Sequence, residues 1–322
     1  MSSAEQQVRQ EPAAAPGFRT VEVPGSVVAV HRLDAAPEAP DGREPALFVH
    51  GLGGSAANWT ALLGRLTDLV DGEALDLPGF GESAPPLDGN LSLSGHVRAV
   101  IGYLEASGRG PVHLFGNSLG GAVTVRLAAL RPDLVRSLTL ISPALPELPP
   151  QRTAWPTGLL AVPGVPALLR RVRSDGRGPE EATADVLRLV YGDPDALSPA
   201  IRAEAVAQYR RRLELPYAMP ALVGTVRGIV SAYTERGDQA LWRQAARVGV
   251  PVLLVYGLRD KLVSYQSARR ACTAFADSRL LVLPDSGHVS MMEHPDEVAR
   301  EVRELLGRIG TPRPVRGTTD TP

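Results

Sequence analysis

Five residues near the middle of the chain, Gly116-Asn117-Ser118-Leu119-Gly120, place a serine between two glycines. They follow the apolar run Val112 to Phe115 and precede a segment with apolar residues at helical spacing, which predicts a strand, a sharp turn and a helix. A side chain at Gly116 or Gly120 would collide with the strand or helix packed beside the turn. The pattern predicts that Ser118 is a nucleophile; the alternative is a turn that only connects a strand to a helix.

A serine hydroxyl becomes a good nucleophile when a neutral imidazole accepts its proton. His288 comes shortly after the predicted strand Leu280 to Leu283, which would carry it to the sheet edge where Ser118 emerges. Its rival, His294, precedes Pro295 at the start of a predicted final helix. We therefore predict that His288 is the general base. The other histidines fall in predicted strands, a predicted helix and a glycine-rich loop: His31, His113, His96 and His50.

A third residue must orient the imidazole and stabilise its protonated form. Asp260 follows the predicted strand Val252 to Tyr256 and would reach the same edge as His288. We predict that Asp260 has this role. Three other carboxylates near predicted strand ends remain as alternatives: Asp76, Glu147 and Asp285.

Acyl transfer also needs N–H donors aimed at the developing oxyanion. The residue after the nucleophile, Leu119, supplies one donor through its backbone. The second is predicted to be the N–H of Leu52, in a glycine-rich loop that follows the predicted strand Ala46 to Val49. A phosphate-binding loop is the alternative, but no Gly-Lys-Ser/Thr follows. The residues predicted to support the two donors are His50, Gly51, Gly53, Gly116, Asn117 and Gly120.

Short apolar runs that alternate with helical patterns predict the elements that position these residues. The segment Phe18 to Leu33 predicts an antiparallel hairpin around Pro24-Gly25. The alternation that follows predicts a parallel sheet. Its predicted strands are 46–49, 74–77, 112–115, 138–141, 252–256 and 280–283, and predicted helices include 202–215, 217–233 and 295–309.

The interval from Ala144 to Val250 contains no convincing strand and is too long for an ordinary loop. It predicts a helical cap inserted into the sheet domain, with a mobile connection near Ser174 to Pro179. Within it, Trp155 to Leu169 is apolar and would either line the site or pack on the sheet domain. The predicted division is a disordered tail at 1–17, a core at 18–143 and 236–310, a cap at 144–235 and a disordered tail at 311–322.

Composition excludes several classes of function. Hydrophobic residues make up 44% of the chain, charged residues 21%, and the formal net charge is -1, so no basic field attracts nucleic acid. No apolar run reaches the roughly 18 residues of a membrane span, and the N-terminal segment does not read as a secretory signal, so we expect a cytoplasmic protein. Cys272 is the only cysteine, which excludes an intramolecular disulfide and a cysteine-rich metal site.

The order and spacing of the motifs resemble the capped α/β-hydrolase superfamily over residues 18 to 310, apart from the cap. The resemblance implies an eight-stranded, mostly parallel sheet with helices on both faces, the triad of Ser118, Asp260 and His288 in that chain order, and an oxyanion hole from Leu52 and Leu119. The motifs that carry it are His50-Gly51-Leu52-Gly53, Asp76 to Ser83, Gly116 to Gly121, Gly257 to Asp260 and Gly287-His288.

These features predict a carboxylesterase-like serine hydrolase for small to medium apolar acyl or aromatic esters, with an acyl-enzyme on Ser118 and no cofactor or metal. Lipases and prolyl aminopeptidases share the remaining motifs. Asn117 and the glycine pair after Leu119 look similar to hydrolases that cleave carbon-carbon bonds in ring-fission products, although Val289 stands where those enzymes typically carry tryptophan. A ligand receptor or scaffold with little turnover is the alternative from another class.

Overall fold

Eight strands form one sheet in the order β1-β2-β4-β3-β5-β6-β7-β8 in the computed structural model, which describes residues 17–33, 40–147, 151–162 and 178–309. The predicted tails, apart from Gly17, and most of the connection predicted at 174–179 lie outside these residues. The strands are β1 (Phe18–Val23), β2 (Ser26–Arg32), β3 (Glu44–Val49), β4 (Val70–Leu75), β5 (Val112–Asn117), β6 (Val135–Ile141), β7 (Val252–Gly257) and β8 (Ser278–Leu283).

Strand β2 pairs antiparallel with both of its neighbours, β1 and β4, and every other pairing in the sheet is parallel. Seven strands therefore run in one direction and β2 alone runs against them. This arrangement confirms the predicted hairpin and the mostly parallel sheet of eight strands.

Strand β4 differs most from its predicted range, whereas strands β3 and β5 to β8 contain theirs and extend it by one to three residues. Strand β4 spans Val70–Leu75, whereas the apolar run predicted 74–77. Two acidic residues, Asp71 and Glu73, interrupt the apolar pattern, yet Arg109 lies 3.2 Å from a carboxylate oxygen of each. Because these ion pairs join segments distant in sequence, the strand could not be recognised from its own residues.

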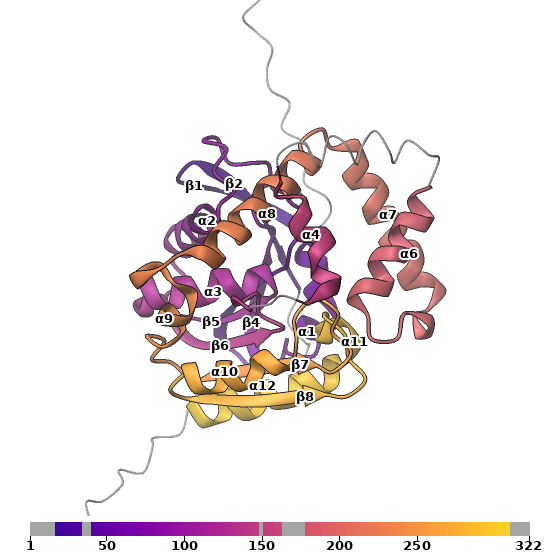
Figure 1. Ribbon diagram of the computed structural model, residues 1–322. Coiled ribbons are helices and arrows are strands. Elements are labelled where there is room, and N and C mark those ends of the chain that lie inside the picture. The colour runs from indigo at the N-terminus through magenta and orange to yellow at the C-terminus, as the bar shows by residue number, and fades with distance from the viewer. Residues whose placement is uncertain (1–16, 34–39, 148–150, 163–177, 310–322) are drawn as a thin grey trace, which may run out of the picture.

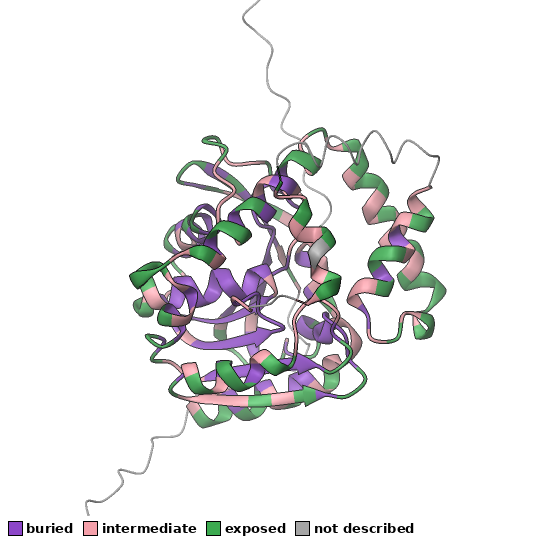
Figure 2. Cartoon of the chain, in the orientation of Figure 1, coloured by how far each residue is buried: buried purple, intermediate pink, exposed green. Residues whose placement is uncertain are grey.

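Helices cover both faces of the sheet because alternate strand residues point to opposite sides. On β3, Leu47 and Val49 join a core with α2, α3, α9 and α10, whereas Ala46 and Phe48 join a second core with α1 and α12. Figure 2 shows buried residues gathered in the sheet and in α3. The helices around the sheet are α1 (Thr60–Gly64), α2 (Leu93–Ser107), α3 (Leu119–Leu130), α9 (Leu241–Ala245), α10 (Gln266–Ala274), α11 (Ser290–Glu293) and α12 (Pro295–Ile309).

Helices α4 (Trp155–Leu159), α6 (Pro179–Val190), α7 (Pro199–Glu214) and α8 (Ala218–Thr234), here called the cap helices, lie between β6 and α9. Helix α7 begins three residues before its predicted start because the Ser198 hydroxyl accepts the N–H of Ile201 as a cap. Helices α6 and α7 lie side by side at one side of the molecule, and α7 has no buried residue (Figure 1). Helix α8 instead buries one face.

Short 3₁₀ turns complete the described secondary structure: Ala56–Trp59, Pro132–Leu134, Arg152–Ala154, Pro194–Ala196 and Gly237–Gln239. No helix within the described ranges is both long enough and apolar enough to cross a lipid bilayer.

The register of the parallel strands brings six loops to one edge of the sheet. Val49 pairs with Gly116, Asn117 with Ile141, and Gly257 with Leu283, each close to the end of its strand. The segments that follow the six parallel strands β3 to β8 therefore leave the sheet together. This edge carries the residues that the sequence singled out.

Candidate active site

Ser118 lies in a strained turn between β5 and α3. Its backbone has φ 53° and ψ −115°, a positive φ that side-chain-bearing residues rarely adopt. The flanking glycines permit the turn: a Cβ on Gly116 would lie 2.6 Å from the Gly120 carbonyl oxygen, and a Cβ on Gly120 would lie 2.1 Å from the Val49 carbonyl oxygen. The collision predicted for a side chain at Gly116 or Gly120 is therefore confirmed.

Gly120→Ala is expected to lower the free energy of unfolding by about 1–3 kcal/mol or more, because the new methyl group meets backbone atoms that cannot move independently. Gly64→Ala is the matched control, since a Cβ there has open space around it. Urea unfolding of the two variants checks this. A Gly120→Ala protein as stable as the Gly64→Ala protein would show that the turn has room to relax.

His288 and Asp260 are joined by a hydrogen bond. His288 Nδ1 donates to Asp260 Oδ2 at 2.9 Å, and the second carboxylate oxygen accepts the N–H groups of Leu262 at 2.8 Å and Val263 at 3.0 Å. Burial by itself would raise the pKa of Asp260, but the adjacent His288 and the Val263 N–H outweigh it, so this pKa lies below its usual range. The ionised carboxylate fixes the proton on Nδ1, which leaves Nε2 able to accept another.

Asn117, the residue before Ser118, joins the His288 loop to the sheet. Its side-chain Nδ2 donates to the carbonyl oxygens of His288 at 3.0 Å and Ile141 at 3.1 Å. The backbone N–H of His288 donates to Val190 O at 2.7 Å, at the end of α6. Ser118 and His288 are therefore held at the same edge by a direct neighbour of the serine.

Glu293 is a second support of this loop, which the sequence did not reveal. Its carboxylate accepts the N–H of Gly287 at 2.8 Å and the N–H of Gly192 at 2.7 Å, so it joins the histidine loop to the cap. Glu293 directly precedes His294 and the predicted final helix, and the sequence predicted no role for it. A carboxylate five residues after a candidate base carries no recognisable signal.

The alternative carboxylates lie elsewhere. Asp76 accepts the N–H groups of Ala56 and Glu82, Asp285 pairs with Arg259, and Glu147 accepts the N–H of Ser264. The rival His294 lies 4.0 Å from Glu297. Of these candidates the structure brings only Asp260 into hydrogen-bonding contact with His288.

The loop after β3 lies against Ser118. A Cβ on Gly51 would lie 3.1 Å from Ser118 Cβ, and the N–H of Gly54 donates back to Gly51 O at 3.0 Å to close the turn. Among the described residues, no acceptor bonds the N–H of Leu52 or of Leu119. Two unpaired amides in the segments that meet at Ser118 are suited to stabilising an oxyanion.

His50 braces this loop from inside the protein. Its Nδ1 donates to Gly51 O at 2.7 Å, and its Nε2 accepts the N–H of Leu77 at 2.9 Å. Burial lowers the pKa of His50 to about 4, and burial likewise lowers the pKa of His96 to about 3. Both imidazoles are therefore neutral at pH 7, and protonation of His50 would break its bond from Leu77.

The free energy of unfolding is expected to fall by about 2 kcal/mol for each of these histidines between pH 7 and pH 5. The unfolded chain binds protons near pH 6.5, whereas folded His50 and His96 resist them, so their contribution is present above pH 6.5 and is lost as the pH falls. Burial raises the pKa of Asp76 to about 6, which offsets part of this loss. Urea titrations at both pH values measure this change in the free energy of unfolding.

His96→Gln should reduce the loss of unfolding free energy between pH 7 and pH 5 by about 2 kcal/mol, because it removes one buried imidazole. Gly64→Ala, which removes no titratable group, is the control and should leave this pH dependence unchanged. An equal loss of unfolding free energy between pH 7 and pH 5 in wild type and His96→Gln would contradict the lowered pKa of His96.

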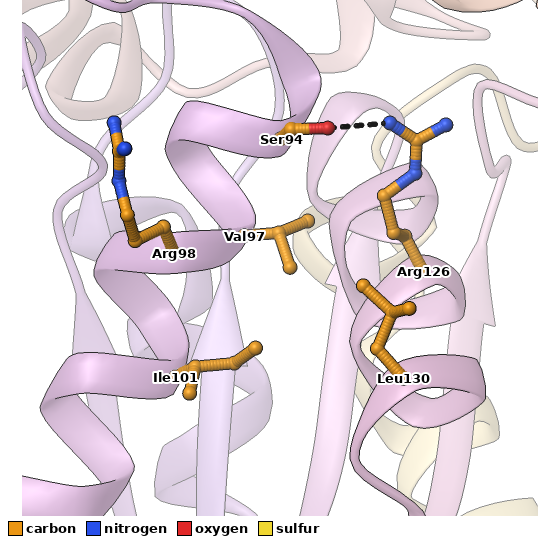
Figure 3. Close-up of a pocket in the computed structure, with 6 residues that line it drawn as sticks. All are labelled: Ser94, Val97, Arg98, Ile101, Arg126 and Leu130. Carbon is orange, nitrogen blue, oxygen red and sulfur yellow. Dashed lines mark hydrogen bonds between the residues drawn. The ribbon is translucent and has the colours of Figure 1, made fainter. Parts of the chain in front are cut away.

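A hollow of about 190 Å³ between α2 and α3 lies apart from these residues (Figure 3). It is lined by Ser94, Val97, Arg98, Ile101, Arg126 and Leu130. Arg126 donates to Ser94 at 2.9 Å and to Gln244 at 3.0 Å and pairs with Glu235, so its guanidinium is occupied. The hollow contains no nucleophile and no residue of the sheet edge described above.

Within the described residues, no group of three or more His, Cys, Asp or Glu side chains is arranged to hold a metal ion.

Comparisons with known proteins agree with the fold. The family described as alpha/beta hydrolase fold matches residues 45–295. A lipase of Mycobacterium tuberculosis is 30% identical over 283 residues, which cover 83% of this chain and 95% of that lipase. The dihydrolipoyllysine-residue acetyltransferase component of the acetoin cleaving system of Cupriavidus necator is 27% identical over 269 residues, which cover 83% of this chain but only 64% of that relative.

Among solved structures, a meta-cleavage product hydrolase of Pseudomonas fluorescens superposes with a TM-score of 0.70 at 20% identity. The match covers 90% of this chain and 97% of that one. At this identity the likeness concerns the fold alone.

Proposed function

Because the chain belongs to the alpha/beta hydrolase fold family, we propose that it is a serine hydrolase that cleaves carboxylic esters through an acyl-enzyme on Ser118. The observation that carries the proposal is the bond from His288 Nδ1 to Asp260 Oδ2 at 2.9 Å, at the edge where Ser118 leaves β5. The lipase relative supports an ester as the substrate.

The proposed reaction has two halves. Ser118 Oγ attacks the ester carbonyl carbon while His288 Nε2 takes the hydroxyl proton, and the oxyanion binds the N–H groups of Leu52 and Leu119. The tetrahedral intermediate collapses, His288 returns the proton to the leaving alcohol, and an acyl-enzyme remains. Water then attacks the acyl carbon with His288 as base, which releases the acid and restores Ser118.

The cap helices would cover this edge, and we propose that residues 144–235 form the cap and help to select the substrate. Part of the apolar stretch predicted to line the site, residues 163–169, lies outside the described residues. In the described part, Leu159 and Val162 are exposed. Apolar side chains open to solvent in the cap favour acyl or aromatic substrates of small to medium size.

Labelling with a fluorophosphonate probe and a panel of p-nitrophenyl esters of increasing acyl length tests this proposal. We expect labelling of Ser118 and turnover that rises with acyl length over the short-chain range. A protein that neither labels nor cleaves any ester would overturn the proposal in favour of a ligand receptor.

Carbon-carbon bond hydrolysis is the second candidate, and the bond from Asn117 Nδ2 to the His288 carbonyl oxygen is the observation that favours it. Asn117, which resembles the asparagine of such enzymes, positions His288 in this chain. Val289 is the residue that disfavours it. Adding one ring-fission dienone acid to the ester panel separates the candidates, since an ester hydrolase leaves that acid intact.

A further inference from the structure

Arg212, near the end of α7, lies against the loop that faces the nucleophile. Its Nη1 is 3.5 Å from the position that a Cβ on Gly53 would occupy. Gly53 is two residues along the same tight turn from Gly51, whose Cβ position is 3.1 Å from Ser118 Cβ. Arg212 therefore places a positive charge beside the turn that supplies the proposed Leu52 donor.

The two preceding arginines on this helix are neutralised, whereas Arg212 is not. Arg210 pairs with Glu180 and Arg211 pairs with Glu82. Within the described part of the chain, the Arg212 side chain has no ion pair and no hydrogen bond, whereas its backbone carbonyl accepts the N–H of Leu215. The other described arginines whose side chains lack a hydrogen bond, an ion pair or an aromatic partner are exposed: Arg152, Arg236, Arg243, Arg269 and Arg300.

Arg212 is instead partly buried, and burial lowers its pKa. Taking a guanidinium out of water without a partner costs folding free energy, because the charged group loses hydration and gains no hydrogen bond in return. Such a side chain is retained at a cost to stability. An anionic group brought in by a ligand would remove that cost.

We propose that Arg212 binds a carboxylate carried by the acyl part of the substrate, so that the preferred substrates are monoesters of dicarboxylic acids. The proposal rests on the ester hydrolysis proposed above. A guanidinium offers a planar pair of N–H donors that fits a carboxylate, and the single charge of Arg212 balances a single negative charge. The oxyanion of the reacting ester would bind the amides of Leu52 and Leu119, and the second carboxylate would bind Arg212.

Matched substrates test the charge preference. The mono-p-nitrophenyl esters of succinic, glutaric and adipic acid are compared with p-nitrophenyl alkanoates of the same chain length. We expect wild type to prefer the charged member of one pair, and Arg212→Gln to lower the ratio of kcat/KM for charged over neutral ester by about 10- to 100-fold, mainly through KM. Arg212→Lys keeps the charge and should restore part of the ratio.

Arg210→Gln is the matched control, because it removes a charge from the same helix that is already paired with Glu180. It should leave the ratio unchanged. If Arg210→Gln lowered the ratio of kcat/KM for charged over neutral ester as much as Arg212→Gln, the preference would come from the total positive charge of the helix. That result would overturn a specific contact with Arg212. Equal charge preference in wild type and Arg212→Gln would also overturn it.

Thermal unfolding gives a readout that does not depend on turnover. Arg212→Gln should unfold at the same Tm as wild type or higher, whereas a structural arginine would lower Tm on removal. Glutarate, which cannot be hydrolysed, should raise the Tm of wild type and of Ser118→Ala but not that of Arg212→Gln. A stabilising effect of glutarate on all three proteins would place the anion elsewhere.

These measurements separate the two proposals. Hydrolysis of neutral esters without any charge preference would overturn the Arg212 site and leave ester hydrolysis standing. Glutarate stabilisation that needs Arg212, in a protein that cleaves no ester, would keep the anion site and overturn the proposed reaction.

Discussion

Ser118→Ala is expected to lower kcat/KM for an activated ester by at least about 10⁴-fold and to abolish labelling by a fluorophosphonate. The reason is that alanine keeps the Cβ and the fold but removes the only atom that can form the acyl-enzyme. The remaining rate would come from substrate binding and from the amides of Leu52 and Leu119. Initial rates with a short p-nitrophenyl ester and gel labelling measure both effects.

Two further variants make this result specific. Ser107→Ala, at the end of α2, removes a hydroxyl that, among the residues the structure describes, bonds the Leu104 carbonyl alone, and it should retain wild-type activity. Ser118→Gly should also be inactive, but glycine relieves the positive φ of 53°, so we expect it to be more stable than Ser118→Ala by about 1 kcal/mol. Substantial activity in Ser118→Ala would move the nucleophile to another residue.

Asp260→Asn is expected to lower kcat by about 10³- to 10⁴-fold with a smaller change in KM. The ionised carboxylate accepts a hydrogen bond from His288 Nδ1, and in the proposed reaction it stabilises the imidazolium that forms when Ser118 attacks. An amide has nearly the same shape but no charge, and it can turn its NH₂ group towards the ring and favour the wrong tautomer. Steady-state kinetics at pH 7 to 9 measure the loss.

The low pKa of Asp260 sets the pH range of this effect. Because the carboxylate is ionised throughout the neutral range, wild type should show no activity change from Asp260 titration above pH 5. Asp285→Asn and Glu147→Gln are the matched controls, since both remove carboxylates that do not contact His288. We expect each control to stay within about threefold of wild type. If Asp285→Asn lost as much activity as Asp260→Asn, the acid would be misassigned.

The turn that carries Ser118 could be predicted because its signal is local. Two glycines at fixed spacing and an apolar run before them specify a strand, a turn and a helix through contacts within a few residues. The mostly parallel sheet followed in the same way from alternating apolar runs. The start of β4 could not be predicted, because Asp71 and Glu73 read as polar until arginines from other segments pair with them.

The order of the motifs along the chain also indicated which loops would meet, since parallel strands end at a common edge. It did not indicate the contacts made there. Those contacts depend on side-chain directions that the packed sheet and cap determine. They are the hydrogen bond between His288 and Asp260, the bond from Asn117 to the His288 carbonyl, and the bond from the Gly287 N–H to Glu293.

The three consecutive arginines of α7 also show that the sequence determines a helix, whereas tertiary packing determines the partners of its side chains. By sequence alone, Arg210, Arg211 and Arg212 are equivalent residues of one predicted helix. The tertiary structure turns the first two towards Glu180 and Glu82 and the third towards Gly53. Local residue type thus determined the nucleophile turn and the layers of the fold. The orientation of one helix against a distant loop decided which charge is left for a ligand, because only packing determines which partners lie within reach.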